Sequence, residues 1–517
     1  MVGFPARAGY GQGDDTRWQV TGVFGGFFIL ALCLAYSLFQ LWGLPMGGPP
    51  VLRPFDGLPF LAGISRINRE FLDLMLIVAV VATAMMVFDL GRRGSRWAAL
   101  LIAVLAVAGV LASAFGWPGK GLIQFPGWVQ AGMSWPEWQL LVALLLLMLL
   151  LVGETAAMPR ARIGWKRALR SGLVRWLGGG VLLGATLFLA LAHPFYAVPF
   201  YENWRLACVL IFLVYLCIGP VYSVWSCWRR AAPYGESRDD PGFLVLWLGF
   251  RVWKDLQTGC LAFPGLRAAL GNARTGILLR DLLVKLFFLP LMVVFLFSEY
   301  GQMHRALATL SRAWLNDPVA AREFPQQVYL LLLHGMFLMD VAVGLIGYAC
   351  ASRWLGNKSR SVEPTLSGWL VTLICYPPFA GVMDGYLPFL TGAAPTAWAA
   401  PGSVADIVLK LITLLLTAVY VWATLVFGLR FSNLTNRGIL GTGPFGWVRH
   451  PAYTAKNLSW WSMYAPQFTG LSQPLFLLGW NVIYYWRAMT EERHLRQDAA
   501  YRAYCEQVRW RFIPRLW

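Results

Sequence analysis

The chain has 517 residues, of which 58% are apolar and only 13% carry a charge. This balance is typical of a polytopic helical membrane protein. The net charge of +18 does not require a nucleic-acid partner, because a Lys and Arg bias in inner loops and contact with anionic lipid headgroups account for it.

Apolar runs long enough to cross the hydrocarbon layer as helices recur along the chain. The first follows a polar start and has no small-residue cleavage site, so we expect a retained span rather than a signal peptide. Two shorter runs, 457–471 and 474–489, predict a terminal hairpin. The expected fold is all-α, with about 12 transmembrane helices. The ten longer runs are 20–42, 70–90, 98–116, 138–157, 177–195, 205–225, 281–298, 326–350, 367–390 and 405–428.

Charge placement predicts the topology. If both termini are cytoplasmic, most of the 43 Lys and Arg residues fall in inner loops, as the positive-inside rule requires. We expect an integral protein of a bacterial inner membrane. The predicted parts are an N-terminal helical bundle (1–225), a connector (226–280), a second bundle (281–428) and a C-terminal module (429–517).

The connector contains an apolar stretch, 243–256, that is interrupted by charged residues and predicts a helix lying in the membrane interface. It is either a lid or lipid-entry surface, or a scaffold helix between the two bundles.

Several ionisable residues fall inside the predicted spans, and each is a candidate for a substrate path or for a structural pair with another helix. His334 and Asp340 are six residues apart, so they point to different sides of their helix. The five histidines show no close metal-ligand spacing, so no metal is implied. The other candidates are Lys285, Lys410 and, near a helix end, Glu154.

Polar residues are concentrated in the last part of the chain. Gly438, Gly441, Gly443 and Pro444 predict an irregular loop over 438–444, which at membrane depth is tolerated only inside protein or against a cavity. Pro451 favours the first turn of a new helix, whose positive end suits a carboxylate or phosphate.

On the last span, Arg487 and Glu491 are four residues apart and face the same way, as do Glu492 and Arg496. They are either ordinary surface ion pairs or part of a site for a ligand with ammonium and carboxylate groups. Nearby aromatic residues suit stacking on a heterocycle or a sulfonium, or a place in an interfacial belt. These residues are Phe445, Trp447, Tyr453, Tyr484 and Tyr485.

The stretch GPFGWVRHPAY, followed after a short hairpin by EERHL, YRAY and RFIP, resembles the isoprenylcysteine carboxyl methyltransferase family. The family pattern is RHPxY and then EExxL, and similar patterns occur in phospholipid methyltransferases and in membrane sterol reductases. The resemblance covers about the last 90 residues. It departs from the family at Thr454 and Ala455, where x-Gly is common, and in the long body that precedes the motif.

The resemblance implies an S-adenosyl-L-methionine pocket and a lipophilic acceptor, isoprenoid or lipid-like and possibly a carboxylate. It assigns Arg487 to orienting or activating the acceptor and Glu491 to holding the cofactor. Methyl transfer needs mainly alignment and desolvation, so no catalytic dyad or metal is implied. The implied cofactor shell is Arg437, Gly438, Ile439, Leu440, Phe445, His450, Pro451, Ala452, Tyr453 and Glu491.

Two alternatives come from other classes of protein. One is an NADPH-dependent reductase of the sterol type, which is weakened because no GxExNPR-like stretch precedes the module. The other is a transporter or scaffold, in which Lys285, His334 and Asp340 would matter most.

Overall fold

A computed structural model describes residues 12–41, 51–52, 67–89, 164–229, 241–259, 262–315, 317–351, 355–381 and 395–516. Within these ranges the fold is helical, apart from two short antiparallel strand pairs. The predicted spans 98–116 and 138–157, residues 382–390 of the span 367–390, and Glu154 lie outside the described residues.

The described part holds 7 helices that are long and apolar enough to cross a membrane. Each coincides with one of the predicted spans, so the all-α membrane class is confirmed. These helices are α1 (Gln12–Leu41), α2 (Arg69–Asp89), α6 (Trp165–Ala192), α8 (Glu202–Arg229), α11 (Ala273–Trp314), α12 (Pro318–Ala349) and α15 (Val404–Phe427).

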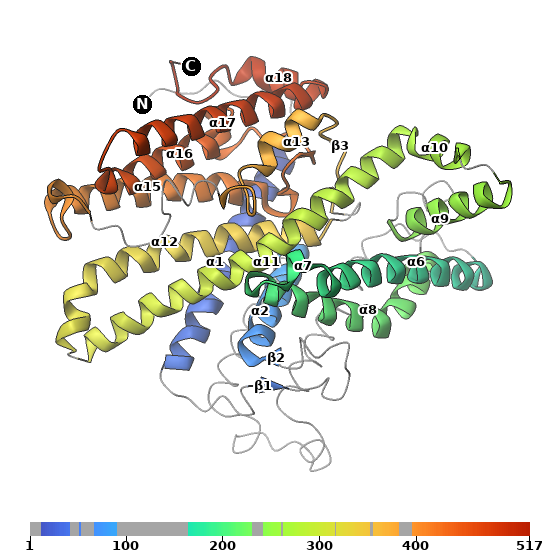
Figure 1. The fold of residues 1–517 in the computed structure, drawn as a ribbon, viewed down its shortest axis with the longest axis horizontal. Coiled ribbons are helices and arrows are strands. Elements are labelled where there is room, and N and C mark those ends of the chain that lie inside the picture. Colours follow the sequence, from blue (N-terminus) through green and yellow to red (C-terminus); the bar gives the residue numbers. More distant parts are fainter. Residues whose placement is uncertain are drawn as a thin grey trace, which may run out of the picture.

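The main apolar core lies where α1, α2, α11, α12 and α15 meet, and its largest fully buried side chains include Phe71, Phe288 and Tyr348. In Figure 1, α11 and α12 run side by side across the molecule, α6 and α8 form a pair on one side, and α15 to α18 lie together near the C-terminus. The outer face of α15 exposes Val404, Leu411 and Leu415, which suits contact with lipid tails.

Short elements connect and cover these helices. They are β1 (Val51–Leu52), β2 (Ile67–Asn68), α7 (Pro194–Ala197), η2 (Pro199–Tyr201), α9 (Pro241–Gln257), α10 (Pro264–Leu270), β3 (Ser361–Val362), α13 (Leu366–Leu373), η4 (Ala397–Ala399), η5 (Gly428–Arg430), β4 (Thr435–Asn436), η6 (Gly443–Gly446), η7 (Ala465–Gln467) and α18 (Ala499–Gln507). The apolar stretch 243–256 is indeed helical, as α9, which packs on α6 and exposes Phe250 and Trp253.

The predicted hairpin consists of α16 (Pro451–Tyr464) and α17 (Ser472–Leu495). At 14 residues, α16 is about 21 Å long, which is too short to cross a hydrocarbon layer of about 30 Å. Neither helix is among the seven that could cross a membrane. The count of about 12 crossings therefore remains a prediction.

Among the predicted ionisable candidates that the structure describes, Lys285, Lys410 and His334 each contact a carboxylate, and Asp340 accepts a hydrogen bond. His334 lies 2.7 Å from a carboxylate oxygen of Glu299 on α11, whereas Asp340 accepts a hydrogen bond of 2.7 Å from Tyr420 on α15. The prediction that His334 and Asp340 point to different sides of their helix is thus confirmed. Lys285 and Lys410 each pair with an aspartate one turn earlier on the same helix.

Candidate functional site

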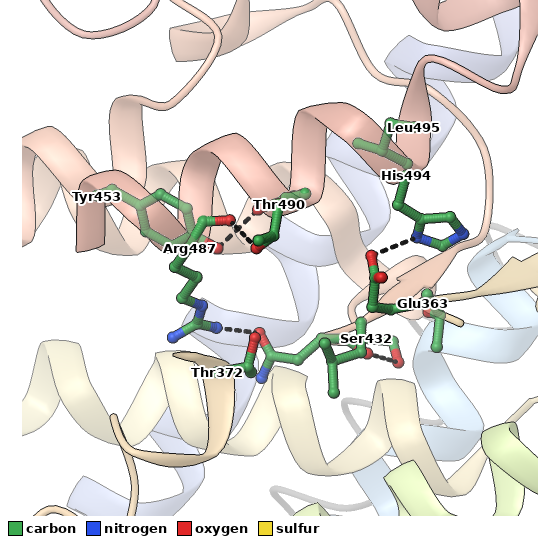
Figure 2. Close-up of a pocket in the computed structure, with 12 residues that line it drawn as sticks. Glu363, Thr372, Ser432, Tyr453, Arg487, Thr490, His494 and Leu495 are labelled. Carbon is green, nitrogen blue, oxygen red and sulfur yellow. Dashed lines mark hydrogen bonds and ion pairs between the residues drawn. The ribbon is translucent and has the colours of Figure 1, made fainter. Parts of the chain in front are cut away.

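A cavity lies between α17, the start of α16, the segment 432–435 and the chain around α13 (Figure 2). Its empty space measures about 420 Å³, a figure that includes open solvent at its mouth. Its walls carry two carboxylates, one guanidinium and one imidazole. The lining residues are Glu363, Thr372, Ser432, Asn433, Leu434, Thr435, Tyr453, Arg487, Thr490, Glu491, His494 and Leu495.

One face of α17 forms a wall of this cavity. Residues 487, 490, 491 and 494 are spaced by three and four, so a helix brings them to the same side. All four line the cavity, and the prediction that Arg487 and Glu491 face the same way is confirmed.

The opposite wall is fixed by strand pairing. β3 pairs with β4, and beyond the ladder the backbone N–H of Glu363 donates a hydrogen bond of 2.8 Å to the carbonyl of Leu434. Leu434 has φ +59°, a left-handed conformation that turns the chain as it enters β4. The pairing brings Glu363 beside the segment 432–435.

Arg487 is 4% exposed and lies in a cage of tyrosine rings. Its guanidinium carbon is 5.4, 5.1 and 5.7 Å from the ring centroids of Tyr376, Tyr453 and Tyr484, distances at which cation–π attraction is effective. One nitrogen, Nη2, donates to the amide oxygen of Asn433 at 2.8 Å and, more weakly, to the Tyr376 hydroxyl. Within the described part of the chain, no carboxylate lies within ion-pair distance of this buried charge.

Glu491 is half-buried at the cavity, and one of its carboxylate oxygens accepts a hydrogen bond of 2.7 Å from the Tyr453 hydroxyl. The Tyr453 ring also stacks on the imidazole of His450, at 5.6 Å and with an angle of 6° between the planes. The RHPxY segment therefore contributes to the cavity through its tyrosine.

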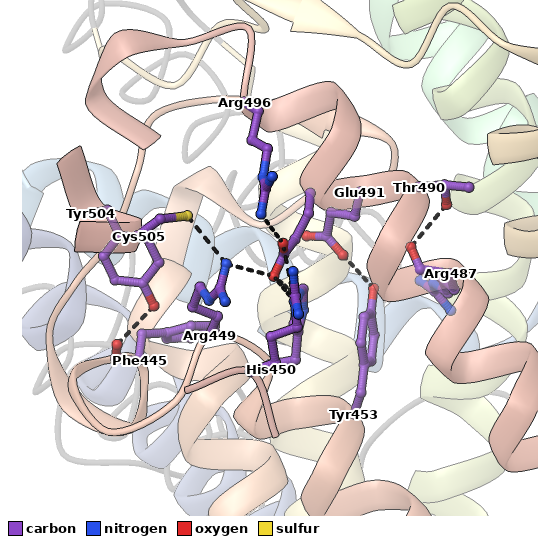
Figure 3. Close-up of polar contacts among 12 residues, drawn as sticks. Phe445, Arg449, His450, Tyr453, Arg487, Thr490, Glu491, Arg496, Tyr504 and Cys505 are labelled. Atoms are coloured by element: carbon purple, nitrogen blue, oxygen red, sulfur yellow. Dashed lines mark hydrogen bonds and ion pairs between the residues drawn. The ribbon is translucent and has the colours of Figure 1, made fainter. Parts of the chain in front are cut away.

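Glu492, the next residue, has a different environment. Its carboxylate lies 3.0 Å from Arg449, 3.2 Å from His450, 3.1 Å from Arg496 and 3.3 Å from Arg511 (Figure 3). We call these five residues the Glu492 cluster. The predicted pair of Glu492 with Arg496 is present. Glu492 also compensates the charge of Arg449 and contacts His450, the two basic residues just before α16.

The electrostatics of the Glu492 cluster favour the charged carboxylate. Burial alone would raise the pKa of Glu492, but the hydrogen bond and charge of His450, together with Arg449 and Arg511, outweigh it and lower the pKa from 4.5 to about 2. Glu492 therefore stays ionised at neutral pH and acts as an internal counter-ion.

The predicted loop over 438–444 is irregular, as expected, and Gly438 and Gly443 adopt φ of +119° and +61°. Arg437, just before it, is buried and donates a hydrogen bond of 2.7 Å to the carbonyl of Gly347 on α12. The backbone N–H of Gly438 donates to the Asn436 side chain at 2.9 Å. Arg437 thus anchors the loop to α12, and the bond of Gly438 to Asn436 fixes the start of the loop locally.

The other residues of the predicted cofactor shell lie in packing positions. Leu440 and Phe445 belong to the main core, and Ile439 packs beside Tyr501 and Tyr504. Pro451 is the first residue of α16. Ala452 packs against the main core.

Of the predicted site residues, the structure thus brings Tyr453, Arg487 and Glu491 together at the cavity. Arg437, Gly438, Ile439, Leu440, Phe445, His450, Pro451 and Ala452 are not among its lining residues. They lie behind or beside it.

Sequence reasoning missed several lining residues, including Glu363, Asn433 and His494. His494 is the fourth letter of EERHL, so its spacing of seven from Arg487 was a usable signal. Glu363 and Asn433 reach the site through the pairing of β3 with β4, which no local pattern indicates. The hydroxyl of Thr435 is buried at the cavity and has no hydrogen-bond partner among the described residues.

Within the described ranges, no three His, Cys, Asp or Glu side chains are grouped so that they could hold a metal ion. Comparison with protein-family models, curated proteins and solved structures finds no significant match to this chain.

Proposed function

We propose that the protein is an integral membrane methyltransferase that uses S-adenosyl-L-methionine to methylate a lipophilic acceptor. The observation that carries the proposal is the cavity on α17, where a half-buried glutamate and a buried arginine, which has no carboxylate partner among the described residues, face the same space. Uncompensated buried charges are costly, and they mark sites where a ligand supplies the missing partner. The motif pair RHPAY and EERHL supports the same reading.

The donor set fits the polar groups of the cofactor. Glu491 offers a carboxylate to an ammonium group, and the Thr435 hydroxyl, which has no partner among the described residues, offers a further hydrogen bond. When bound, the cofactor supplies a methyl group on a positively charged sulfur.

Arg487 has the acceptor-side role in this proposal. Its tyrosine cage holds the guanidinium in place, and its remaining donors are available to an oxygen of the acceptor. Because the site adjoins apolar helices, a lipophilic acceptor enters from the bilayer. The distribution of basic residues supports an orientation with both termini cytoplasmic, and the membrane we propose is a bacterial inner membrane.

The two alternatives lead to different ligands. A reductase of the sterol type would bind NADPH, and a transporter or scaffold would bind neither cofactor. The contacts of Lys285 with Asp281 and of His334 with Glu299 suit a structural role for these two residues, which weakens the transporter. Asp340 accepts a hydrogen bond from Tyr420, and its second carboxylate oxygen is buried without a partner among the described residues.

The test is calorimetric titration of the purified full-length protein with S-adenosylhomocysteine and, in parallel, with NADPH. We expect saturable binding of S-adenosylhomocysteine alone. Glu491→Gln should weaken this binding at least tenfold, whereas Glu506→Gln, on the exposed side of α18, should leave it unchanged. Binding of NADPH alone, or of neither ligand, would reject the methyltransferase.

A further inference from the structure

Asn433 is a cavity residue whose side chain holds the Arg487 guanidinium. Arg487 leaves α17 on the side of the cavity (Figure 2). Its Nη2 donates a hydrogen bond of 2.8 Å to the amide oxygen of Asn433, and the amide nitrogen of Asn433 donates one of 3.1 Å to the Tyr376 hydroxyl. The orientation of this amide is fixed, because a guanidinium only donates hydrogen bonds and therefore faces the amide oxygen.

Both anchors of Asn433 lie outside the C-terminal module. Its amide nitrogen is bound to Tyr376, and its backbone N–H donates a hydrogen bond of 2.8 Å to the hydroxyl of Tyr348 on α12. The rings of these two tyrosines pack on Phe288 of α11, Tyr348 stacked at 5.4 Å and Tyr376 edge-on at 4.9 Å between ring centroids. The helical body therefore sets the position of Arg487 through Asn433.

The hydrogen-bond and ring partners of Arg487 in the described part of the chain are all neutral. The two carboxylates of the cavity have other partners: Oε1 of Glu363 accepts from a backbone N–H two residues on, and Glu491 accepts from the Tyr453 hydroxyl. Neither carboxylate lies within ion-pair distance of the guanidinium. The Asn433 amide thus holds a buried cation in place and leaves its charge uncompensated.

We propose that Asn433 is the positioning residue of Arg487 and sets the charge preference of the site. Its neutral amide holds the guanidinium without neutralising it, so that the charge is left for an anionic oxygen of the acceptor. This inference rests on the proposed function and deepens it. It assigns the acceptor to lipids with an anionic group, a carboxylate or a phosphate, because a guanidinium binds either with two parallel hydrogen bonds.

Replacing the amide by a carboxylate of the same shape tests the role of charge. In Asn433→Asp we expect turnover to fall at least 100-fold, because an internal ion pair competes with the acceptor for Arg487. Affinity for S-adenosylhomocysteine should stay within about twofold, and the midpoint of thermal unfolding should be unchanged or raised, because a buried cation gains a counter-ion. A residue with only a structural role would lose stability and turnover together.

Asn433→Ala removes the hold on the guanidinium without adding a charge. Turnover should fall only about tenfold, because Arg487 loses its alignment but keeps its charge. The aspartate, which keeps the shape of the side chain, should therefore lower turnover more than the alanine, whereas a packing role predicts the reverse order. Asn272→Asp is the control for an added charge, because Asn272 is the exposed N-cap of α11, where aspartate caps equally well.

Turnover is measured with the full-length protein in detergent, as transfer of tritiated methyl from S-adenosylmethionine to a bacterial lipid extract. The extract is first separated on an anion exchanger into anionic lipids and a fraction of neutral and zwitterionic lipids, and we expect label only in the anionic fraction. Label released as methanol by mild alkali would identify a carboxylate as the anionic group, and label that stays with a phosphate-containing product would identify a phosphate. Either result supports the inference.

Other outcomes would overturn it. These are full turnover in Asn433→Asp, a loss of turnover in that variant together with lower stability or weaker S-adenosylhomocysteine binding, and label in the neutral and zwitterionic fraction at the level of the anionic one. Binding of S-adenosylhomocysteine by the wild type without label in either fraction would also overturn it, since no anionic lipid then serves as the acceptor. Failure of the wild type to bind S-adenosylhomocysteine would instead reject the proposed function.

Discussion

Two neighbouring regions along α17 differ in whether their buried charges have partners of opposite charge. In the Glu492 cluster, one carboxylate is surrounded by three arginines and a histidine, all within 3.3 Å. At the cavity, the Arg487 guanidinium has tyrosine rings and an amide as neighbours, and no carboxylate among the described residues. A buried charge with its partners in place is structural, whereas one without a charged partner points to a ligand.

Helix geometry explains why these regions lie so close together. Successive residues on a helix are rotated by about 100°, so Glu491 and Glu492 leave α17 in different directions. Glu491 reaches the cavity and Tyr453, while Glu492 reaches the start of α16 and the C-terminal segment. Of the two adjacent glutamates of EERHL, Glu491 therefore belongs to the cavity and Glu492 to the Glu492 cluster.

The largest expected effect comes from breaking the Glu492 cluster. Glu492→Gln removes the charge that compensates the buried Arg449, and we expect the free energy of unfolding to fall by about 3–5 kcal/mol. Denaturant unfolding in detergent, followed by tryptophan fluorescence, measures this loss. Glu506→Gln is the control, and a stability loss no larger than that of the control would contradict the structural role of the cluster.

Acid should break the same cluster without a mutation. The pKa of Glu492 is lowered to about 2, so its stabilisation is fully present above about pH 4.5 and is lost as the pH falls towards 2. The contribution is up to about 3 kcal/mol. Unfolding measured from pH 6 to pH 3 should show a steeper loss in the wild type than in Glu492→Gln, and parallel curves would speak against this assignment.

The fold class could be predicted from the sequence because lipid contact selects long apolar helices, and the seven described spans lie where the apolar runs predict them. The terminal hairpin was harder to interpret. Its helices α16 and α17 combine exposed apolar side chains, such as Leu475 and Trp486, with polar clusters on their other faces, so apolar content alone did not define their length or their place relative to a membrane.

The cavity could be predicted only in part. Arg487, Glu491 and Tyr453 were accessible to sequence reasoning because a motif and a helical spacing connect them. Glu363 lies more than a hundred residues away along the chain and reaches the site through a two-residue strand pairing. Such a contact depends on tertiary structure, and the residues that flank Glu363 in the sequence do not indicate it.

The cavity should respond differently from the Glu492 cluster when its own charge is removed. Arg487→Met keeps much of the side-chain length. Because no carboxylate of the described part of the chain pairs with the guanidinium, we expect a stability change of only about 1 kcal/mol. Methyl transfer should fall about 100-fold, while S-adenosylhomocysteine binding is retained. Binding is measured by calorimetry with S-adenosylhomocysteine, and turnover by transfer of tritiated methyl from S-adenosylmethionine to lipid. Arg502→Met is the control for both. Loss of cofactor binding in Arg487→Met would mean that Arg487 contacts the cofactor rather than the acceptor.

The smallest expected effect separates a hydrogen bond at the cavity from one outside it. Tyr453→Phe removes the hydroxyl that donates to Glu491 at 2.7 Å but keeps the ring beside His450 and Arg487. Tyr504→Phe removes a hydrogen bond of similar length, 2.8 Å, to the carbonyl of Phe445.

Each of these two substitutions should lower the free energy of unfolding by about 1 kcal/mol, as expected for the loss of one hydrogen bond. Only Tyr453→Phe should also weaken S-adenosylhomocysteine binding, by about fivefold, because Glu491 loses the partner that orients it. Equal binding by the two variants would mean that the Tyr453 hydroxyl stabilises the fold without preparing the cavity for its ligand.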